Sequence, residues 1–279
     1  ENGGWGELFD GALNQVGLPD ADGNIIEAPY SARGNDNIKD FYQTGTVLQN
    51  NVNLNFGGND SYLNLNLGNV RREFILDGDQ SNRNNFVLNA GKKFGKLSVG
   101  GTFTFTNLNT KQANVNASTS RSDYTLLTNL LQTASNVPIN EFKNRGIYGW
   151  NGYYQNPFWA KENNRLNETR NFINLGINTD YEINKNINIS YRGSVQLRNN
   201  SQISYANELI APSWSDGDFS SASDFYQSNY GSTYYYGDVM ANFSYDLTDK
   251  IGMKLNVGQN MQYNYSKRIS QGGANLEIP

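Results

Sequence analysis

Within residues 46–68, apolar and polar residues alternate over 51–56 and again over 63–68. A Gly-Gly-Asn-Asp stretch at residues 57–60 is flanked by six apolar positions, namely Val52, Leu54, Phe56, Leu63, Leu65 and Leu67. Asparagine fills most of the places between these six positions. Period-two alternation on both sides of a Gly/Asn/Asp turn predicts an antiparallel β-hairpin. Because successive side chains of a strand point to opposite faces, one face of this hairpin is apolar and the other consists of amides.

Three more hairpins of the same kind follow, with predicted turns at residues 95–96, 184–186 and 248–250. Their apolar rows run for about ten residues, which lets a tilted strand cross the hydrocarbon of a bilayer. A soluble sandwich can alternate in this way, but its water-facing side usually carries charged residues, whereas the polar side here is mainly uncharged. The sequence therefore favours an all-β fold, an antiparallel transmembrane β-barrel segment of about eight strands with a wet interior.

Turns within hairpins are short, whereas the connections between hairpins are predicted to be long: near 71–83, at 109–168 and at 200–232. Short periplasmic turns and long extracellular loops are typical of outer-membrane barrels. We therefore expect three regions along the chain, namely a long extracellular loop region at 1–45, a barrel segment of four hairpins at 46–265, and the start of a further loop at 266–279.

Two segments in the predicted loops have patterns of their own. Leucines at helical spacing predict a short helix within residues 122–135. Residues 20–24 (Asp-Ala-Asp-Gly-Asn) look like the start of a calcium loop, but Ile25 and Ser31 stand where that loop needs glycine and glutamate. A plain turn is the favoured interpretation of residues 20–24.

Composition narrows the function classes. Charged residues make up 17% of the 279 residues and mean hydropathy is −0.67, because Asn, Gly, Ser, Thr and Tyr carry the polarity. The 13% aromatic content argues against disorder, and the net charge of −4 argues against a nucleic-acid partner. The chain has neither histidine nor cysteine, so catalytic triads, thiol nucleophiles and His or Cys metal sites are excluded. Asp77 and Asp79 could form a carboxylate pair, but two Asp residues around a glycine favour a turn. We expect no enzyme, no cofactor and no metal.

Three short motifs carry a family resemblance. They are Asp-Phe-Tyr-Gln-Thr-Gly at 40–45, Asn-Leu-Asn-Phe-Gly-Gly at 53–58 and Asn-Pro-Phe-Trp-Ala at 156–160. In this order the chain resembles SusC/RagA-type TonB-dependent transporters of the Gram-negative outer membrane. The motifs cover about residues 40–200, and the rest of the chain is similar only in its pattern.

The resemblance implies a 22-stranded barrel around a plug, a SusD-like surface lipoprotein outside, and import of glycans or peptides energised by TonB. This chain shows eight strands, without a plug domain, a TonB-box-like segment or a final strand that ends in an aromatic residue. We therefore expect a barrel segment of a longer outer-membrane protein, with TonB acting through parts not present here. Two alternatives stay open: a SusC-like structural subunit of a larger outer-membrane complex, and an independent eight-stranded barrel such as an adhesin.

Parity within each strand predicts which side chains meet lipid and which meet the lumen. The apolar set should face outer-membrane lipid: Val52, Leu54, Leu63, Leu65, Phe103, Ile177, Ile189, Phe243 and Leu255. The polar set should face the lumen: Asn53, Asn64, Thr104, Asn178, Arg192, Arg198 and Asn256. Arg192 is the most decisive position, because arginine in mid-membrane on the lipid face costs about 2–4 kcal/mol.

Aromatic residues gather in the two largest predicted loops. We expect six of them to face a lipoprotein partner or the nutrient, because Tyr and Trp dominate interface hot spots: Trp150, Tyr153, Tyr154, Trp214, Tyr226 and Tyr230. The alternative is that such residues pack the loops into a compact unit, which is the favoured interpretation for Phe158 and Trp159.

Overall fold

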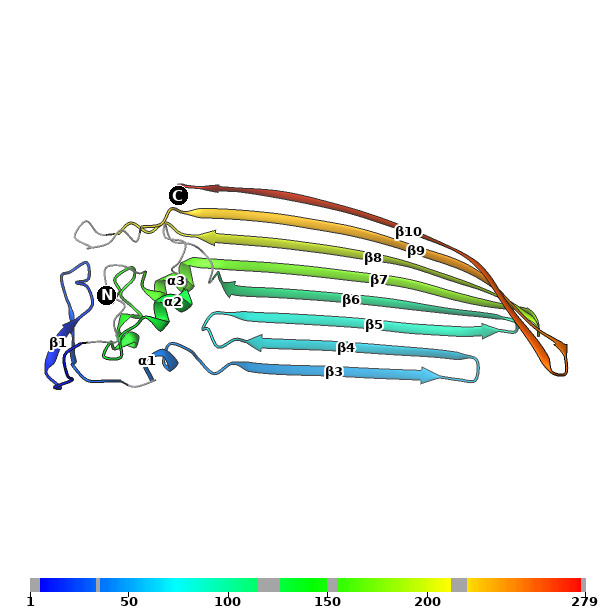
Figure 1. Ribbon diagram of the computed structural model, residues 1–279, viewed down its shortest axis with the longest axis horizontal. Coiled ribbons are helices and arrows are strands. Elements are labelled where there is room, and N and C mark those ends of the chain that lie inside the picture. The colour runs from blue at the N-terminus through cyan, green and yellow to red at the C-terminus, as the bar shows by residue number, and fades with distance from the viewer. Residues whose placement is uncertain (1–5, 34–35, 115–125, 150–154, 212–219, 277–279) are drawn as a thin grey trace.

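An eight-stranded antiparallel sheet dominates the computed structural model, which describes residues 6–33, 36–114, 126–149, 155–211 and 220–276 (Figure 1). The strands neighbour one another in chain order from β3 to β10. Their bounds are β3 Thr46–Gly57, β4 Ser61–Glu73, β5 Gln80–Phe94, β6 Leu97–Ala113, β7 Asn164–Asn184, β8 Ile187–Ala206, β9 Asp224–Thr248 and β10 Ile251–Ala274. The predicted all-β class and the four hairpins are confirmed.

The four hairpin turns lie together at the end of the sheet that is far from the helices (Figure 1). Gly95 makes the β5–β6 turn with a φ of +60°, which glycine adopts without strain. In the β7–β8 turn the backbone N–H of Asn186 donates to Oδ1 of Asn184 over 2.9 Å. Short turns therefore sit where the Gly and Asn signals placed them.

The strands are longer than the sequence predicted. The connection between β4 and β5 covers only residues 74–79, not 71–83, and the last strand runs through 266–274, where a loop was expected. The two large connections shrink to 114–163 and 207–223. The strands extend beyond the apolar alternation because backbone hydrogen bonds of the ladder also pair polar stretches.

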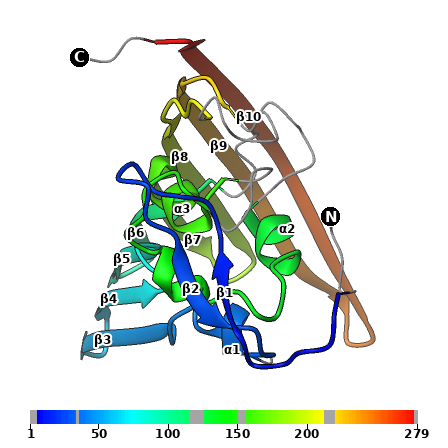
Figure 2. The same ribbon diagram turned by 90° about the vertical axis from the view of Figure 1, so that its left-hand side faces the viewer.

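The opposite end of the sheet carries a small separate unit, here called the cap (residues 6–45, 126–149 and 155–163 as far as described). It holds the two-stranded sheet of β1 (Leu13–Val16) and β2 (Ile26–Pro29) and the helices α1 (Asp36–Lys39), α2 (Leu126–Leu131), η1 (Ile139–Phe142) and α3 (Pro157–Asn163). Viewed from this end, the cap lies in front of the sheet, between edge strands β3 and β10 (Figure 2). Residues 1–45 thus contain more structure than the expected loop.

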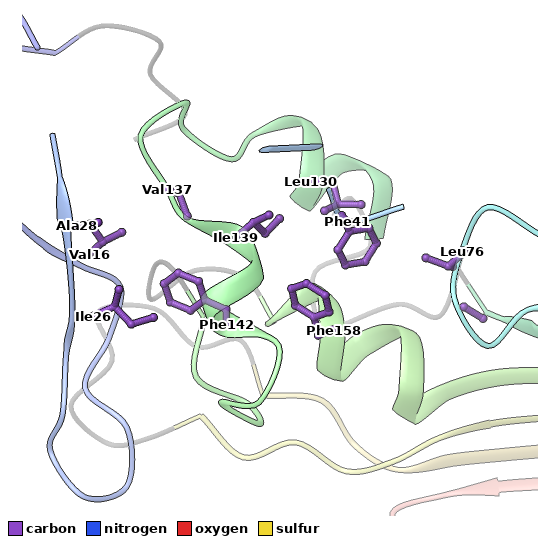
Figure 3. Packing of buried hydrophobic residues seen from close by; sticks show 11 residues of the cluster. Val16, Ile26, Ala28, Phe41, Leu76, Leu130, Val137, Ile139, Phe142 and Phe158 are labelled. Carbon is purple, nitrogen blue, oxygen red and sulfur yellow. The ribbon is translucent and has the colours of Figure 1, made fainter. Parts of the chain in front are cut away.

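The cap has its own hydrophobic core, which joins its N-terminal strands to the segment between β6 and β7 (Figure 3). Phe142 and Leu130 are fully buried, and the Phe158 and Phe41 rings lie 4.9 Å apart. The packing interpretation of Phe158 is confirmed. The described part of α2 lies within the predicted helical segment. Among the described helices, none is long and apolar enough to cross a membrane.

Register divides the large sheet into an apolar face and a polar face. Residues paired across neighbouring strands share a face, and one continuous row reads Leu54, Leu65, Leu88, Phe103, Leu175, Val195, Tyr235 and Tyr263. The next row towards the turns, on the other face, reads Asn55, Asn64, Asn89, Thr102, Gly176, Ser194, Tyr236 and Gln262. The two predicted sets of side chains therefore lie on opposite faces of one sheet.

Candidate functional site

The polar face carries an ion pair near the middle of the sheet. Arg192 on β8 and Asp238 on β9 are register partners, and two contacts of 2.9 and 3.1 Å join the guanidinium to the carboxylate. The Tyr236 hydroxyl also donates to this carboxylate. Only 7% of the Asp238 side chain is exposed, whereas 58% of Arg192 is. Bidentate pairing fixes the arginine while leaving much of its guanidinium open to a solute.

Amide and hydroxyl side chains extend this polar face along the strands. Asn66 donates to Asn53 across the first hairpin, and the Thr102 hydroxyl donates to Asn89 over 2.8 Å. Asn178 lies in the same register row as Arg192 and covers Gly100, where an added Cβ would lie 2.5 Å from its Oδ1. Between its charged residues the face thus offers uncharged hydrogen-bonding groups.

Towards the cap, cation–aromatic pairs occupy the polar face. The Arg198 guanidinium lies 5.5 Å from the Phe172 ring, and that of Arg268 lies 5.5 Å from the Tyr230 ring. The Tyr226 hydroxyl donates to Ser270 over 3.1 Å. Tyr226 and Tyr230 were expected in a loop, but both lie on β9, because that strand begins at Asp224. Four other aromatic candidates lie outside the described residues: Trp150, Tyr153, Tyr154 and Trp214.

Asn156 organises the cap. Its side chain accepts from the Phe158 N–H over 3.0 Å and so caps the N-terminus of α3, with Pro157 in the first turn. Its Nδ2 donates to the carbonyls of Phe142 (2.8 Å) and Tyr148 (3.0 Å). The side chain is fully buried. The Asn-Pro-Phe-Trp-Ala motif is therefore a helix start that also anchors the preceding turn.

Asp77 attaches the cap to the β4–β5 connection, and Asp79 joins that connection to the start of β7. Asp77 pairs with the almost fully buried Lys161 over 3.1 Å, and Asp79 pairs with Arg165 over 3.0 Å while it accepts from the Ala113 N–H. The hydrogen bond and charge of Lys161 lower the pKa of Asp77, whereas burial raises the pKa of Asp79. Gly78 between them has a φ of +86°, as a turn requires. Each carboxylate therefore pairs with a different basic side chain, and the two do not act as a carboxylate pair. This arrangement agrees with the predicted turn.

Residues 20–24 also form a turn. The Asp20 carboxylate accepts from the backbone N–H groups of Asn24 (2.8 Å) and Asp22 (3.0 Å), and these contacts lower its pKa. Arg145 lies 3.5 Å from the same carboxylate. Across the described residues, no group of three or more acidic side chains could hold a metal ion.

Two solved structures share this architecture at low sequence identity. A chain of the RagAB peptide transporter matches with a TM-score of 0.66 and 11% identity, over 90% of this chain and 28% of that chain. A chain of the RagAB peptide importer in its closed-closed state matches with a TM-score of 0.63 and 10% identity, over 85% and 26%. The sheet shares its fold with a segment of those chains. The chain spans about a quarter of the length of those chains, and no family model and no curated protein matches it.

Proposed function

We propose that this chain forms part of the wall of a TonB-dependent importer in the outer membrane of a Gram-negative bacterium. In this proposal it takes up peptides or glycans together with a SusD-like surface lipoprotein. The fold shared with RagAB supports the proposal. The stagger of the strands is the observation that carries it.

That stagger is large. The register row through Gly57, the last residue of β3, reaches Asp238, and β9 runs ten residues further to Thr248. The turn end thus advances by about 33 Å along the strands while the sheet widens by about 29 Å over six strand spacings. If all the turns lie at the same height along the barrel axis, the strands must tilt by roughly 45–50° to that axis. This angle is close to the strand tilt of membrane barrels.

The apolar face supports a lipid environment. Many of its large side chains are exposed, among them Leu54, Leu67, Leu175, Ile177, Tyr235, Val239 and Tyr263. Soluble monomers rarely expose contiguous apolar patches larger than a few hundred Å². A bilayer covers such a face without another protein, and the opposite face with Arg192, Asn178 and Arg198 then lines the lumen.

Loops and cap would lie on the cell surface. The short turns offer little surface for recognition, whereas the cap end gathers helices and long connections, and Tyr226 and Tyr230 lie on the part of β9 towards it. We assign lipoprotein and nutrient contact to this end, and coupling to TonB to polypeptide other than these 279 residues.

Uptake by cells that lack the protein tests this proposal. We expect the protein in the outer-membrane fraction, and we expect its deletion to reduce uptake of labelled peptides or labelled oligosaccharides by tenfold or more. Replacing Tyr153, Tyr154 and Trp214 by alanine should weaken capture of the lipoprotein or the nutrient while leaving barrel assembly unchanged. Normal uptake of both solute classes after deletion would contradict an importer and would favour a structural subunit.

A further inference from the structure

The apolar face ends abruptly at a row of amides on the side of the cap. One register row reads Asn50, Asn69, Asn84, Asn107, Asn171, Asn199, Gly231 and Lys267. The next row on the same face towards the turns reads Val52, Leu67, Phe86, Phe105, Ile173, Leu197, Thr233 and Tyr265. We call the first of these the asparagine row. The side chains change from apolar to amide between these two neighbouring rows. This change marks the outer limit of the hydrocarbon, because unpaired amides are costly in lipid.

Hydrogen bonds between strands hold parts of the asparagine row in place. Asn69 donates to Asn84, and Asn107 donates to Asn171, each over 2.7 Å. Six strands contribute an asparagine, so the amides span about 24 Å across the sheet. Each amide carries more donors and acceptors than these bonds use. The row therefore offers a wide, uncharged surface that suits sugar hydroxyls.

Two hollows lined by adjacent register rows lie over β7 to β10, and together they are here called the groove. Its upper part holds about 730 Å³, with Asn171, Asn199 and Lys267 towards the cap and Ile173, Leu197 and Tyr265 below them. Its lower part holds about 520 Å³ and is lined by the next rows of the apolar face, including Leu175, Val195, Tyr235, Met261 and Tyr263. Both volumes fall in the range of about 300–1,000 Å³ that is usual for ligand pockets.

Glycines keep the groove open. Gly231 and Gly237 lie on β9 on the apolar face, and a Cβ added to either would meet no atom within 4 Å. Gly193 is the register partner of Gly237, but the Tyr191 hydroxyl lies over it, 2.7 Å from where a Cβ would be, so the open space lies above β9. Beside this gap the rings of Tyr235 and Tyr263 stand 6.2 Å apart. The result is an apolar channel on a face that otherwise carries large side chains.

Lys267 places a cation at the polar end of the groove. Lys267 is exposed, and within the described part of the chain its ammonium group has no ion-pair partner. It lies in the asparagine row, directly above the apolar row that ends in Tyr265. The anionic head of an amphiphile would pair with the Lys267 ammonium group, and its acyl chain would fill the apolar channel.

We propose that this groove binds one phosphorylated glycolipid of the outer leaflet, the lipid A type. An acyl chain lies along β9 over Gly231 and Gly237 and beside the Tyr191 ring, a phosphate contacts Lys267, and sugar hydroxyls contact the asparagine row. The width of the amide surface favours a saccharide head over the smaller head of a phospholipid. This inference rests on the proposed membrane orientation and adds to it a specific lipid site.

The test measures lipid A that stays bound to the full-length protein. The protein is extracted from its own outer membrane in mild detergent, and bound lipid is identified by native mass spectrometry and by release of 3-hydroxy fatty acids. We expect about one lipid A per protein, and we expect Gly237→Trp, which fills the channel, to reduce it by roughly tenfold. Lys267→Gln should reduce it less, by roughly threefold.

Two control variants change equivalent residues outside the groove. Ala241→Trp adds the same side chain to β9 on the same face, four residues towards the turn, and Lys254→Gln removes a charge from the polar face of β10. Both should retain lipid A at the wild-type level. Equal lipid A in wild type and both groove variants would overturn the proposal, and so would retention of phospholipid alone or of a second protein copy in the groove.

The same preparations separate this inference from the proposed function. If the protein fractionates with the outer membrane and imports its solute but retains no lipid A, only the glycolipid site is wrong. If the protein is absent from the outer membrane, the importer proposal itself fails.

Discussion

The strands and the cap are built on different principles, although a single chain forms both. In the sheet, each residue is placed by its register with a neighbouring strand, and the same two-residue period repeats from β3 to β10. In the cap, a few long-range contacts decide the structure, such as the ring contact between Phe41 and Phe158. The sheet exposes a whole face of apolar side chains, whereas the cap buries a cluster of them in a core. This difference is expected between a lipid-facing wall and a water-facing unit.

The largest effect should come from a charge placed on the apolar face. Phe103 lies in the central apolar row and packs edge-on against Phe86 at 5.5 Å. Phe103→Arg should cost about 2–4 kcal/mol and sharply lower the yield of assembled protein, measured by heat-modifiable mobility of outer-membrane fractions. Thr104→Arg, one residue on and on the opposite face, should assemble normally. Equal yields of the two variants would contradict the division into two faces.

A second substitution should break the cap and leave the sheet intact. Asn156→Ala removes a helix cap and the Nδ2 donor to the carbonyls of Phe142 and Tyr148, of which Phe142 keeps the Arg145 N–H. This loss should destabilise the cap by about 3 kcal/mol. Hydrogen exchange should then rise in residues 126–163 while β3 to β10 stay protected. The exposed Asn144 provides the control, since Asn144→Ala should change neither region. Exchange that rises equally in the sheet would mean that the two regions are not separable.

Acid should loosen the contact between the two regions by a smaller amount. Because Lys161 lowers the pKa of Asp77, this pair stabilises the fold above the unfolded pKa of 3.8, and the stabilisation is lost as pH falls through the lower folded value. Asp77 is about half exposed, so the effect should be about 1 kcal/mol or less. Limited proteolysis of the cap across pH 2.5–5, a range of about 2.5 pH units around the unfolded pKa of 3.8, measures it. Asp77→Asn should flatten the pH dependence, and an unchanged profile would contradict the assignment.

The strand core could be read from the sequence because its pattern is local. The alternation around Phe56 and Leu63 fixes the hairpin, the turn and both faces at once. The strand ends could not be read in this way, because polar stretches such as that around Tyr226 and Tyr230 pair without an apolar signal. The asparagine row was missed although its signal was present, since Asn50 and Asn107 continue the apolar parity of their strands.

The cap was predictable only in fragments. The Asn-Pro pair at 156–157 is a helix-start signal that could have placed α3, but the aromatic residues around it drew attention to binding instead. The pairing of Asp79 with Arg165 could not be predicted, because 86 residues of sequence separate them and only the folded register brings β5 and β7 to the same end of the sheet.

Alternating exposure to lipid and water along one strand tests the central claim most directly. The 279 residues contain no cysteine, so single cysteines can be introduced at residues 102–106 of β6 in the membrane-embedded protein and labelled with nitroxide. We predict that labels at 103 and 105 are relaxed by oxygen dissolved in the bilayer, and that labels at 102, 104 and 106 are relaxed by a water-soluble nickel chelate. Equal access of both reagents to neighbouring positions, or the opposite alternation, would contradict a membrane wall with its apolar face to lipid.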